Sequence, residues 1–521
     1  MLRLKETSLE WALKHVLRYR ETDLLPFPFE FAAISHDWIA IKDFLKQADV
    51  LHWPVRPHRT LLAPKSNYGF RIVTQLDPLD SLVFASLIYE IAEDIEAHRV
   101  PIGRGTVFSY RVAIANDGQL FDTEIDYEDF RRRTSELLQE SDYSHVAVAD
   151  IADFYPRIYI HRLDNALGAA TNRANHVKAI MQMLSGWNGT ESYGIPVGNQ
   201  PSRLLAEAAL NDVDEAMLAA EFEFVRFNDD YRILANSHDQ AYRRLAFLAE
   251  ILYRNHGLTL QPQKTNVLTQ DDYAARSRIT PERRELDELY AKFQGLIDEL
   301  GLSSWYAEID YDDLDDRQRA LVDSLNLQDL FDGEVNSESP DFAVIRFVLR
   351  RLGQLNDASI AHKLIDHLDK IYPVFPDIIN YLSSLRDLDR TECTRIGNLV
   401  LEALENSIVS ELEYHRMWGL DLFAGSTRWG HSDKFFRMLG ETGDPAIRRK
   451  LILAMGRAHQ RHWFQTRWRE LFSESPWPKR ALIAAASCLA ADARKHWYNS
   501  IESRLDPLEL AVMRWAKANP F

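Results

Sequence analysis

The stretch FVRFNDDYRILA, residues 224–235, decides the fold because it places two adjacent acids between two apolar runs. Both runs are rich in the aromatic and aliphatic residues typical of strands, so Asp229 and Asp230 stand at the tip of a predicted hairpin. Two ionised carboxylates side by side repel each other, and removing them from water is costly unless a counter-charge lies nearby. A polar turn is one interpretation, since Asn and Asp favour turns. A site for divalent cations is the other.

Composition restricts the class of protein. The chain has 521 residues, of which 46% are hydrophobic, and a formal net charge of −17. This length predicts roughly two to four domains, and the negative charge excludes a protein that coats nucleic acid non-specifically. The longest apolar run, ALIAAASCLAA (481–491), is too short to span a membrane. Cys393 and Cys488 have no neighbours at metal-ligand spacing. We expect a cytoplasmic protein with no membrane segment.

A third acid follows another predicted strand. HVAVAD (145–150) is apolar up to its last residue, Asp150. An acid at the end of one strand and an acid pair at a hairpin tip can meet on one edge of a sheet. Three such carboxylates can hold two divalent cations for in-line displacement at phosphorus. Hard oxygen ligands favour Mg²⁺ or Mn²⁺.

Two further segments flank the hairpin in the sequence. YGIPVGNQPSRLLAEAAL (193–210) begins with glycines and a proline and continues into an amphipathic helix. Its glycines allow the backbone to approach a flat partner such as a nucleobase, although an ordinary loop before a helix has the same composition. GLTLQPQKTNVL (257–268) leads to Lys264. That lysine can neutralise phosphate or protonate a leaving group, or it can be a solvated surface cation.

Together, in this order and spacing, the four segments resemble the palm motifs of reverse transcriptases, the RNA-directed DNA polymerases. The resemblance implies that Asp150, Asp229 and Asp230, with the backbone carbonyl of Ile151, bind two catalytic Mg²⁺ or Mn²⁺ ions. It implies that a template and primer grip is formed by Gly194, Pro196, Gly198, Gln200 and Ser202. The palm hairpin carries Phe227 and Asn228 where many relatives have Tyr and a small or aliphatic residue. We expect this departure to affect the efficiency of catalysis more than the chemistry of the reaction, because both acids of the hairpin are present.

The same resemblance extends to residues that would bind the incoming dNTP. APKSNYGFRIVTQLDPLDSLVF (63–84) is similar to the fingers segment of these enzymes, which implies that Lys65 and Arg71 contact the triphosphate. Lys264 is implied to take part in dNTP binding. Tyr155, five residues after Asp150, stands where these polymerases keep an aromatic ring that excludes the 2′-hydroxyl of an NTP. The alternatives are that the three cations are ordinary surface residues and that Tyr155 is an aromatic residue of the core.

The predicted fold is α+β, with the fingers and palm of a right-hand polymerase followed by an all-α domain. We expect an N-terminal helical extension (1–60), fingers and palm (61–275), and an α-helical domain (276–521). Helical segments such as DFAVIRFVLRRLGQL (341–355) and PAIRRKLILAMGRAH (445–459) follow one another there with short breaks. Their lengths and spacing favour HEAT-like repeats in place of a thumb, with an irregular helical bundle as the alternative.

This arrangement is similar to the bacterial abortive-infection and defence-associated reverse transcriptases. The similarity implies an antiphage role, a homo-oligomer, and single-stranded DNA grown from a tyrosine of the protein with little or no template. Covalent tethering suits an enzyme without a broad basic surface. RNA-templated cDNA synthesis on a partner non-coding RNA is an alternative. A non-catalytic palm scaffold with an α-repeat interaction domain is another.

Overall fold

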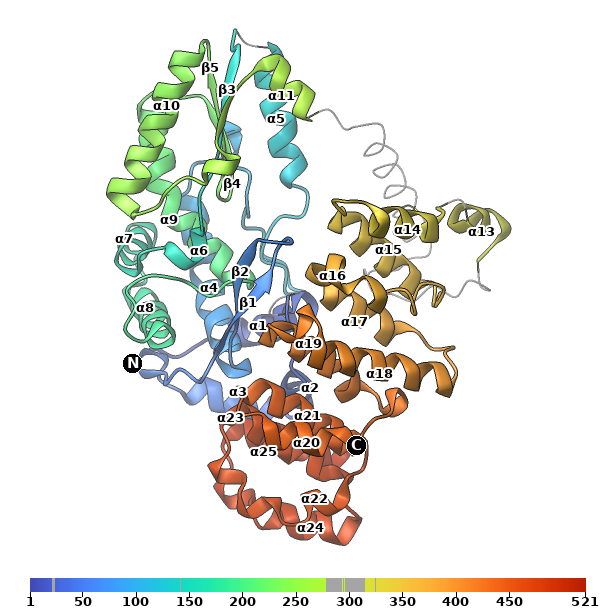
Figure 1. Cartoon of the computed structure of the whole chain (residues 1–521). Coiled ribbons are helices and arrows are strands. Elements are labelled where there is room, and N and C mark those ends of the chain that lie inside the picture. Colours follow the sequence, from blue (N-terminus) through green and yellow to red (C-terminus); the bar gives the residue numbers. More distant parts are fainter. Residues whose placement is uncertain (21–23, 141, 278–292, 294, 296–313, 324) are drawn as a thin grey trace. The chain divides into compact units, whose positions relative to one another are not determined.

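The computed structural model describes residues 1–20, 24–140, 142–277, 293, 295, 314–323 and 325–521, coloured along the chain in Figure 1. Contacts within the chain define two units. The first unit consists of Met1–Phe31, Trp38–Thr60 and Ile72–Arg278, and the second of Ala32–Asp37, Leu61–Arg71 and Ile279–Phe521. The expected domain boundaries after residues 60 and 275 stay predictions.

The first unit is built on a four-stranded antiparallel sheet, with strand order β4-β5-β3-β6. The strands are β3 (His145–Asp150), β4 (Phe224–Phe227), β5 (Asp230–Ala235) and β6 (Asn266–Thr269). Helices connect β3 to β4 and β5 to β6, while only two residues separate β4 from β5. The sequence order is therefore strand, helices, hairpin, helix, strand, with β3 in the interior of the sheet.

One face of this sheet packs against α5 (Tyr127–Glu140). Phe130, Leu137 and Leu138 of the helix form a core with Val146 of β3 and Leu234 of β5. Because side chains alternate along a strand, residues two positions apart share this face. Asp150, Val148 and Val146 therefore point to the same side, and the acid lies at the end of the apolar row.

Helix α9 (Gln200–Ala219) lies on the other face, where its buried acids contact Arg226 of β4. The helix begins where the side chain of Asn199 accepts the N–H of Ser202 at 2.9 Å, a normal N-cap. Helix α10 (His238–Ile251) packs on β3 and β5 and contacts α9.

The remaining helices of the first unit surround this core. Asp77 caps α4, which begins at Pro78. The helices are α1 (Glu6–Tyr19), α3 (Trp38–Gln47), α4 (Pro78–His98), α6 (Phe154–Arg157), α7 (Ile160–Ala170), α8 (Ala174–Asn188) and α11 (Gln270–Ser277). Helix α2 (Glu30–His36) is divided between the two units.

The second unit contains the tip of a two-stranded hairpin and a series of helices. The hairpin strands are β1 (Arg59–Pro64) and β2 (Phe70–Gln75), and the segment Leu61–Arg71 belongs to this unit. The helices are α13 (Asp316–Asp323), α14 (Leu327–Asn336), α15 (Phe342–Gln354), α16 (Leu368–Ile371), α17 (Phe375–Ser384), α18 (Arg390–Asn406), α19 (Glu413–Gly425), α20 (Lys434–Glu441), α21 (Pro445–Arg457), α22 (Arg461–Phe464), α23 (Pro476–Ala485), α24 (Ala491–Asn499) and α25 (Pro507–Ala518).

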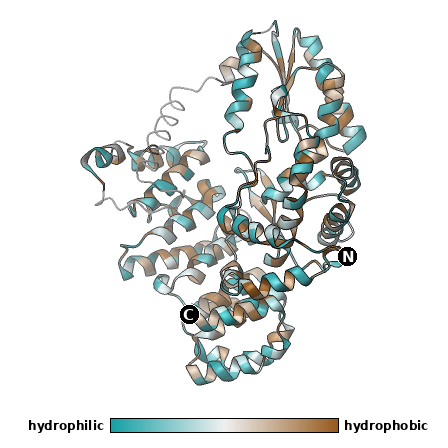
Figure 2. Ribbon diagram, turned by 180° about the vertical axis from the view of Figure 1, so that it is seen from behind, coloured by the Kyte–Doolittle hydropathy of each residue, from teal (hydrophilic) through white to brown (hydrophobic). Residues whose placement is uncertain are grey.

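The helices of the second unit pack in a regular succession. Each odd-numbered helix from α15 to α25 contacts the next odd-numbered one, and single helices carry a hydrophobic and a hydrophilic side (Figure 2). No strand occurs among the described residues of 314–521. The all-helical character is as expected, and the HEAT-like repeat stays a prediction. In the described part of the chain, no helix has both the length and the apolar content needed to cross a membrane.

Candidate active site

The three predicted acids lie at the same end of the palm sheet. Asp150, the last residue of β3, is the register partner of Asp230, the first residue of β5. The backbone N–H of Ile151 donates to the carbonyl of Asp229 at 3.0 Å, which ties the hairpin turn to the end of β3. Segments that lie about 80 residues apart in the sequence thus bring the carboxylates to adjoining positions.

The turn between β4 and β5 consists of Asn228 and Asp229. Asn228 has a φ of 55°, in the left-handed region that Asn tolerates better than most residues. Its side chain lies between two neighbours: Oδ1 accepts the hydroxyl of Tyr155 at 3.3 Å, and Nδ2 donates to Oδ1 of Asp229 at 3.0 Å. The residue that departs from the family pattern therefore orients one of the three acids.

Charge is incompletely balanced at this turn. Burial, and next the negative charge of Asp150, raise the pKa of Asp229 to about 6. Lys264 donates from Nζ to Oδ2 of Asp150 at 2.6 Å. Burial opposes the charge on Lys264, but its hydrogen bond to Asp150 and the nearby acids outweigh burial and raise its pKa. Lys264 thus neutralises Asp150 more than Asp229.

The third acid has different partners. Oδ2 of Asp230 accepts the hydroxyl of Tyr127 at 3.0 Å, and Oδ1 accepts Nη1 of Arg232 at 3.2 Å. Burial and the charge of Asp230 raise the pKa of Tyr127 to about 12. Sequence reasoning missed both partners. Arg232 shares the face of Asp230 by the two-residue period of the strand and could have been found, whereas nothing local marks Tyr127.

The glycine-proline loop, residues 193–199, packs beside the segment that follows Asp150. The N–H of Ile195 donates to the carbonyl of Tyr155 at 3.1 Å, and that of Gly194 to the carbonyl of Ile158 at 2.8 Å. Gly194 and Gly198 have φ values of 97° and 125°, which L side chains rarely adopt. These glycines are therefore needed for the backbone path itself.

The other grip residues lie where this loop enters α9. Pro196 lies within the loop, between Gly194 and Gly198, and Gln200 is the first residue of the helix. The hydroxyl of Ser202 is buried and has no hydrogen-bond partner among the described residues. Contact of these residues with a template or primer stays a prediction.

Two predicted nucleotide-binding residues lie in the second unit. Lys65 is exposed, and Arg71 is partly buried, both within the hairpin segment Leu61–Arg71. The site described above is formed by the first unit alone. Contact of Lys65 and Arg71 with a triphosphate stays a prediction.

The donor set at the turn has the chemistry of a magnesium or manganese site. Asp150 is only 7% exposed, and a cation between Asp150 and Asp229 would relieve the repulsion that, after burial, contributes to the raised pKa of Asp229. Among the described residues, no three acids, histidines or cysteines are already arranged around a common point. The ammonium of Lys264 is hydrogen-bonded to the carboxylate of Asp150. The carboxylates fit the ions, and binding would require Lys264 to move from Asp150.

The comparisons with known proteins identify the class. The family model of the reverse transcriptase (RNA-dependent DNA polymerase) matches residues 101–302. This range includes Asp150, both acids of the hairpin and Lys264. The chain therefore contains a reverse transcriptase domain and is an RNA-directed DNA polymerase by virtue of that domain. Domains of this family act on dNTPs and nucleic acid and use divalent metal ions such as Mg²⁺.

The chain is also similar to solved structures of telomerase. One is telomerase from Candida albicans in complex with a TWJ fragment of telomeric RNA, with 12% identity, a TM-score of 0.31, and coverage of 73% of this chain and 69% of that chain. Another is apo telomerase from Candida tropicalis, with 10% identity, a TM-score of 0.32, and coverage of 82% of this chain and 73% of that chain. No curated protein matches the chain.

Proposed function

We propose that the chain synthesises DNA by nucleotidyl transfer at a two-metal site held by Asp150, Asp229 and Asp230. The observation that carries this proposal is the pairing of Asp150 with Asp230 across neighbouring strands, with Asp229 bonded through its carbonyl to Ile151. Bound there, two Mg²⁺ or Mn²⁺ ions would activate the attacking hydroxyl and stabilise the charge on the phosphate oxygens. The carbonyl of Ile151 is proposed as a further oxygen ligand.

The chain's own residues have separate proposed roles. Lys264, which donates to Asp150, would be released from that carboxylate if metal ions were bound there, and its ammonium could then neutralise the phosphates of the incoming dNTP. Lys65 and Arg71 hold the triphosphate from the fingers hairpin. The glycine loop and the start of α9, including Gln200 and Ser202, support the template or primer.

Tyr155 is proposed to select dNTPs over NTPs. Its hydroxyl donates to Asn228, so its ring is fixed beside the turn that carries Asp229. A ring held there leaves no room for a 2′-hydroxyl on the sugar. Replacing it by Val should lower the discrimination between dNTP and NTP by roughly tenfold or more. Discrimination equal to that of the wild type would rule out this role, and Phe at this position is the matched control that retains the ring.

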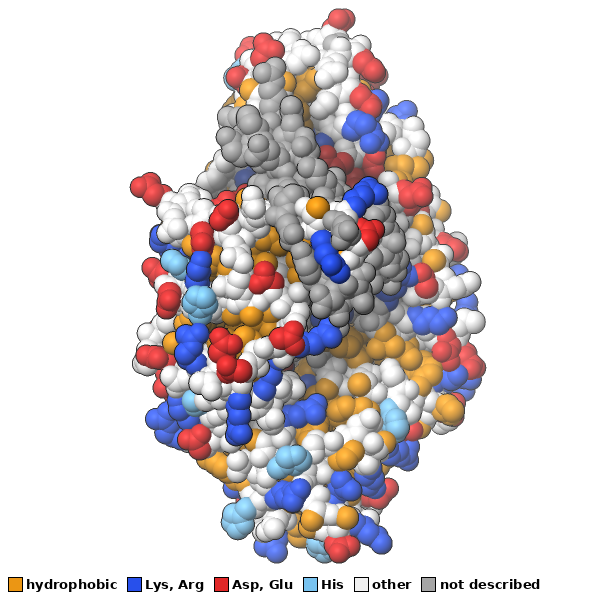
Figure 3. Space-filling model, turned by 90° about the vertical axis from the view of Figure 1, so that its right-hand side faces the viewer, with side chains coloured by type: hydrophobic (Ala, Val, Ile, Leu, Met, Phe, Trp, Pro, Cys, Tyr) orange, Lys and Arg blue, Asp and Glu red, His pale blue; other side chains and the backbone are white. Residues whose placement is uncertain are grey.

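Within this class we propose an antiphage-defence enzyme of the bacterial abortive-infection type, primed by its own tyrosine and acting as a homo-oligomer. The net charge of −17 supports tethered synthesis, because a weakly basic surface holds a free primer–template duplex poorly. On the face drawn in Figure 3, acidic and basic side chains are interspersed. The proposed HEAT-like repeats of the second unit would replace a thumb.

Incubation of the purified protein with labelled dNTPs and Mg²⁺, without added nucleic acid, tests this proposal. Product should stay with the protein in phenol partition until protease is added, and Asp150→Asn should abolish it. Product of one repeated, defined sequence would show a co-purified RNA template instead of free synthesis. Equal incorporation by wild type and Asp150→Asn, or no incorporation with any primer or template, would leave the palm as a non-catalytic scaffold.

A further inference from the structure

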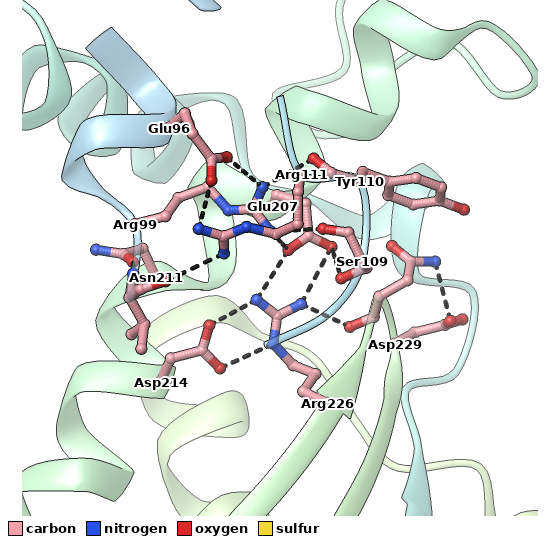
Figure 4. Close-up of polar contacts among 12 residues, drawn as sticks. Glu96, Arg99, Ser109, Tyr110, Arg111, Glu207, Asn211, Asp214, Arg226 and Asp229 are labelled. Atoms are coloured by element: carbon pink, nitrogen blue, oxygen red, sulfur yellow. Dashed lines mark hydrogen bonds and ion pairs between the residues drawn. The ribbon is translucent and has the colours of Figure 1, made fainter. Parts of the chain in front are cut away.

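Arg226, the residue before the hairpin aromatic, is completely buried on the α9 side of the palm sheet (Figure 4). Its Nε donates to Oδ1 of Asp214 at 2.8 Å, and its Nη2 donates to Oδ2 of Asp214 at 2.5 Å and to Oε2 of Glu207 at 3.0 Å. Its Nη1 donates to Oε1 of Glu207 at 3.2 Å and to the carbonyl of Asn228 at 2.9 Å. A guanidinium has five N–H donors, so each one is used.

The acceptors of Arg226 are themselves held in place. Glu207 also accepts Nη2 of Arg99 at 2.6 Å and the hydroxyl of Ser109 at 2.6 Å. Arg99 in turn donates from Nη1 to Glu96 at 3.0 Å. Glu207 is therefore bonded from Arg99 directly after α4, from Ser109 further along the chain and from Arg226 of β4. The guanidinium has a single position that satisfies all of these groups.

Four of the five N–H groups of Arg226 donate to carboxylates, and the fifth donates to the backbone of the turn. Asn228, whose carbonyl it bonds, has the left-handed φ of 55°. The side chain of the same Asn228 donates to Oδ1 of Asp229. A continuous path of hydrogen bonds thus runs from the buried ion pairs through Asn228 to the carboxylate of Asp229.

A purely structural role would not require this last bond. Asp214 and Glu207 already balance the guanidinium and Arg99, and buried ion pairs are seldom more stable than well-packed apolar groups. Their best-attested use is to fix one arrangement among several. We propose that Arg226 is a positioning residue that holds the Asn228–Asp229 turn, and so keeps the carboxylate of Asp229 at the metal site. This inference rests on the function proposed above.

The test compares two conservative variants by direct metal binding. Arg226→Lys retains the charge but has three donors and no planar fork. Arg111→Lys is the matched control: Arg111 is also buried and paired with Glu96, but it has no bond to Arg226 or the turn. Free Mn²⁺ is titrated by electron paramagnetic resonance with full-length protein, and thermal unfolding is recorded for each variant.

Arg226→Lys should bind Mn²⁺ about tenfold more weakly, as is usual when a group that orients a metal ligand is lost. Arg111→Lys should bind Mn²⁺ with an affinity within twofold of that of the wild type, even if its melting temperature falls as far as that of Arg226→Lys. Equal weakening in both variants, or wild-type affinity in Arg226→Lys, would overturn the proposal.

Asn228→Gly gives an independent test if Arg226→Lys does not fold. Glycine accepts the left-handed φ and retains the carbonyl bonded by Arg226, so that only the two bonds of the Asn228 side chain, to Asp229 and from Tyr155, are removed. Mn²⁺ affinity should fall severalfold, and unchanged affinity would overturn the proposed path. Failure of the wild type to bind Mn²⁺, or wild-type affinity in Asp229→Asn, would instead refute the proposed metal site itself.

Discussion

Glu207, which is buried behind the β4–β5 hairpin, and Asp229, which is partly buried at its turn, differ in the charge around them. Burial opposes ionisation of Glu207, yet the charges of Arg226 and Arg99 outweigh it and lower the pKa of this carboxyl. Burial and the charge of Asp150 raise the pKa of Asp229 to about 6. The interior side of the hairpin therefore contains an acid, Glu207, whose counter-charges outweigh its burial. At the turn, Lys264 and Arg232 balance the three acids only in part.

The count of charges supports this contrast. Behind the hairpin, three acids (Glu96, Glu207 and Asp214) are paired with three arginines (Arg99, Arg111 and Arg226). At the turn, Lys264 and Arg232 face three acids. A buried charge that the protein leaves uncompensated is a position where a metal ion contributes most. The proposed metal site is therefore distinguished by incomplete counter-charge and not by its number of acids.

The largest expected effect comes from removing the charge of Asp229. Asp229→Asn should reduce nucleotide incorporation by about 10³-fold, since metal ions supply several kcal/mol of transition-state stabilisation and each tenfold is about 1.4 kcal/mol. Its melting temperature should stay equal or rise, because the repulsion with Asp150 is relieved. Primer-extension rates and calorimetry measure the two effects, and a destabilised but active variant would contradict the contrast.

The same isosteric change at Asp214, behind the hairpin, should lower the free energy of unfolding. Asp214→Asn leaves Arg226 with one carboxylate fewer in a dry environment, and breaking a buried pair costs about 3–5 kcal/mol. Urea denaturation monitored by tryptophan fluorescence measures this loss. A loss below about 1 kcal/mol would mean that the ion pairs are not what keeps this side of the sheet together.

His15 represents a third case, a buried titratable group whose hydrogen-bond partner is an uncharged carbonyl. Its Nδ1 lies 2.7 Å from the carbonyl of Gly118, and burial lowers its pKa to about 4. In the unfolded chain His15 becomes protonated near pH 6.5. The contribution of neutral His15 to the free energy of unfolding is therefore fully present above pH 6.5 and is lost as the pH falls toward 4. The loss should be about 3 kcal/mol between pH 6.5 and 4.

Denaturant unfolding of wild type and His15→Gln across this pH range measures the contribution of His15. The stability difference between the two proteins should depend on pH only within this window. A pH-independent difference would show that folding does not lower the pKa of His15.

The smallest expected effect concerns the partner of the third acid. Tyr127→Phe removes the hydroxyl that donates to Asp230 but leaves Arg232 in place. A single hydrogen bond to a charged group is worth about 1.5–3 kcal/mol when buried, but Tyr127 is 39% exposed. We therefore expect incorporation to fall by about two- to fivefold. A loss as large as that of Asp229→Asn would place Tyr127 in the reaction itself.

Much of this arrangement could be predicted from local sequence. The strand ending in Asp150, the hairpin with its acid pair, and helices α4 and α9 follow from strand alternation, turn composition and helical periodicity. Asp150 ends β3 and Asp230 begins β5, so antiparallel pairing of these two strands is enough to bring the acids together. The pairing of Lys264 with Asp150 is compatible with the predicted segment but was not itself foreseen.

The ion pairs behind the hairpin could not be predicted in this way. The contacts of Arg226 with Glu207 and of Glu207 with Arg99 join residues that are 19 and 108 positions apart, and no local pattern encodes them. Arg226 did carry one signal, a charged residue inside a strand that is otherwise apolar. Local periodicity also failed to show that the hairpin segment Leu61–Arg71 groups with the second unit, because that grouping depends on long-range contacts.

The most direct test of the proposed two-metal site is a crystal structure of the full chain with Mn²⁺ and a non-hydrolysable dNTP analogue, recorded at a wavelength where manganese scatters anomalously. The site predicts two anomalous peaks about 3.5–4 Å apart, with oxygens of Asp150 and Asp229 as ligands and Lys264 withdrawn from Asp150. Bound nucleotide with no manganese at these carboxylates would contradict it.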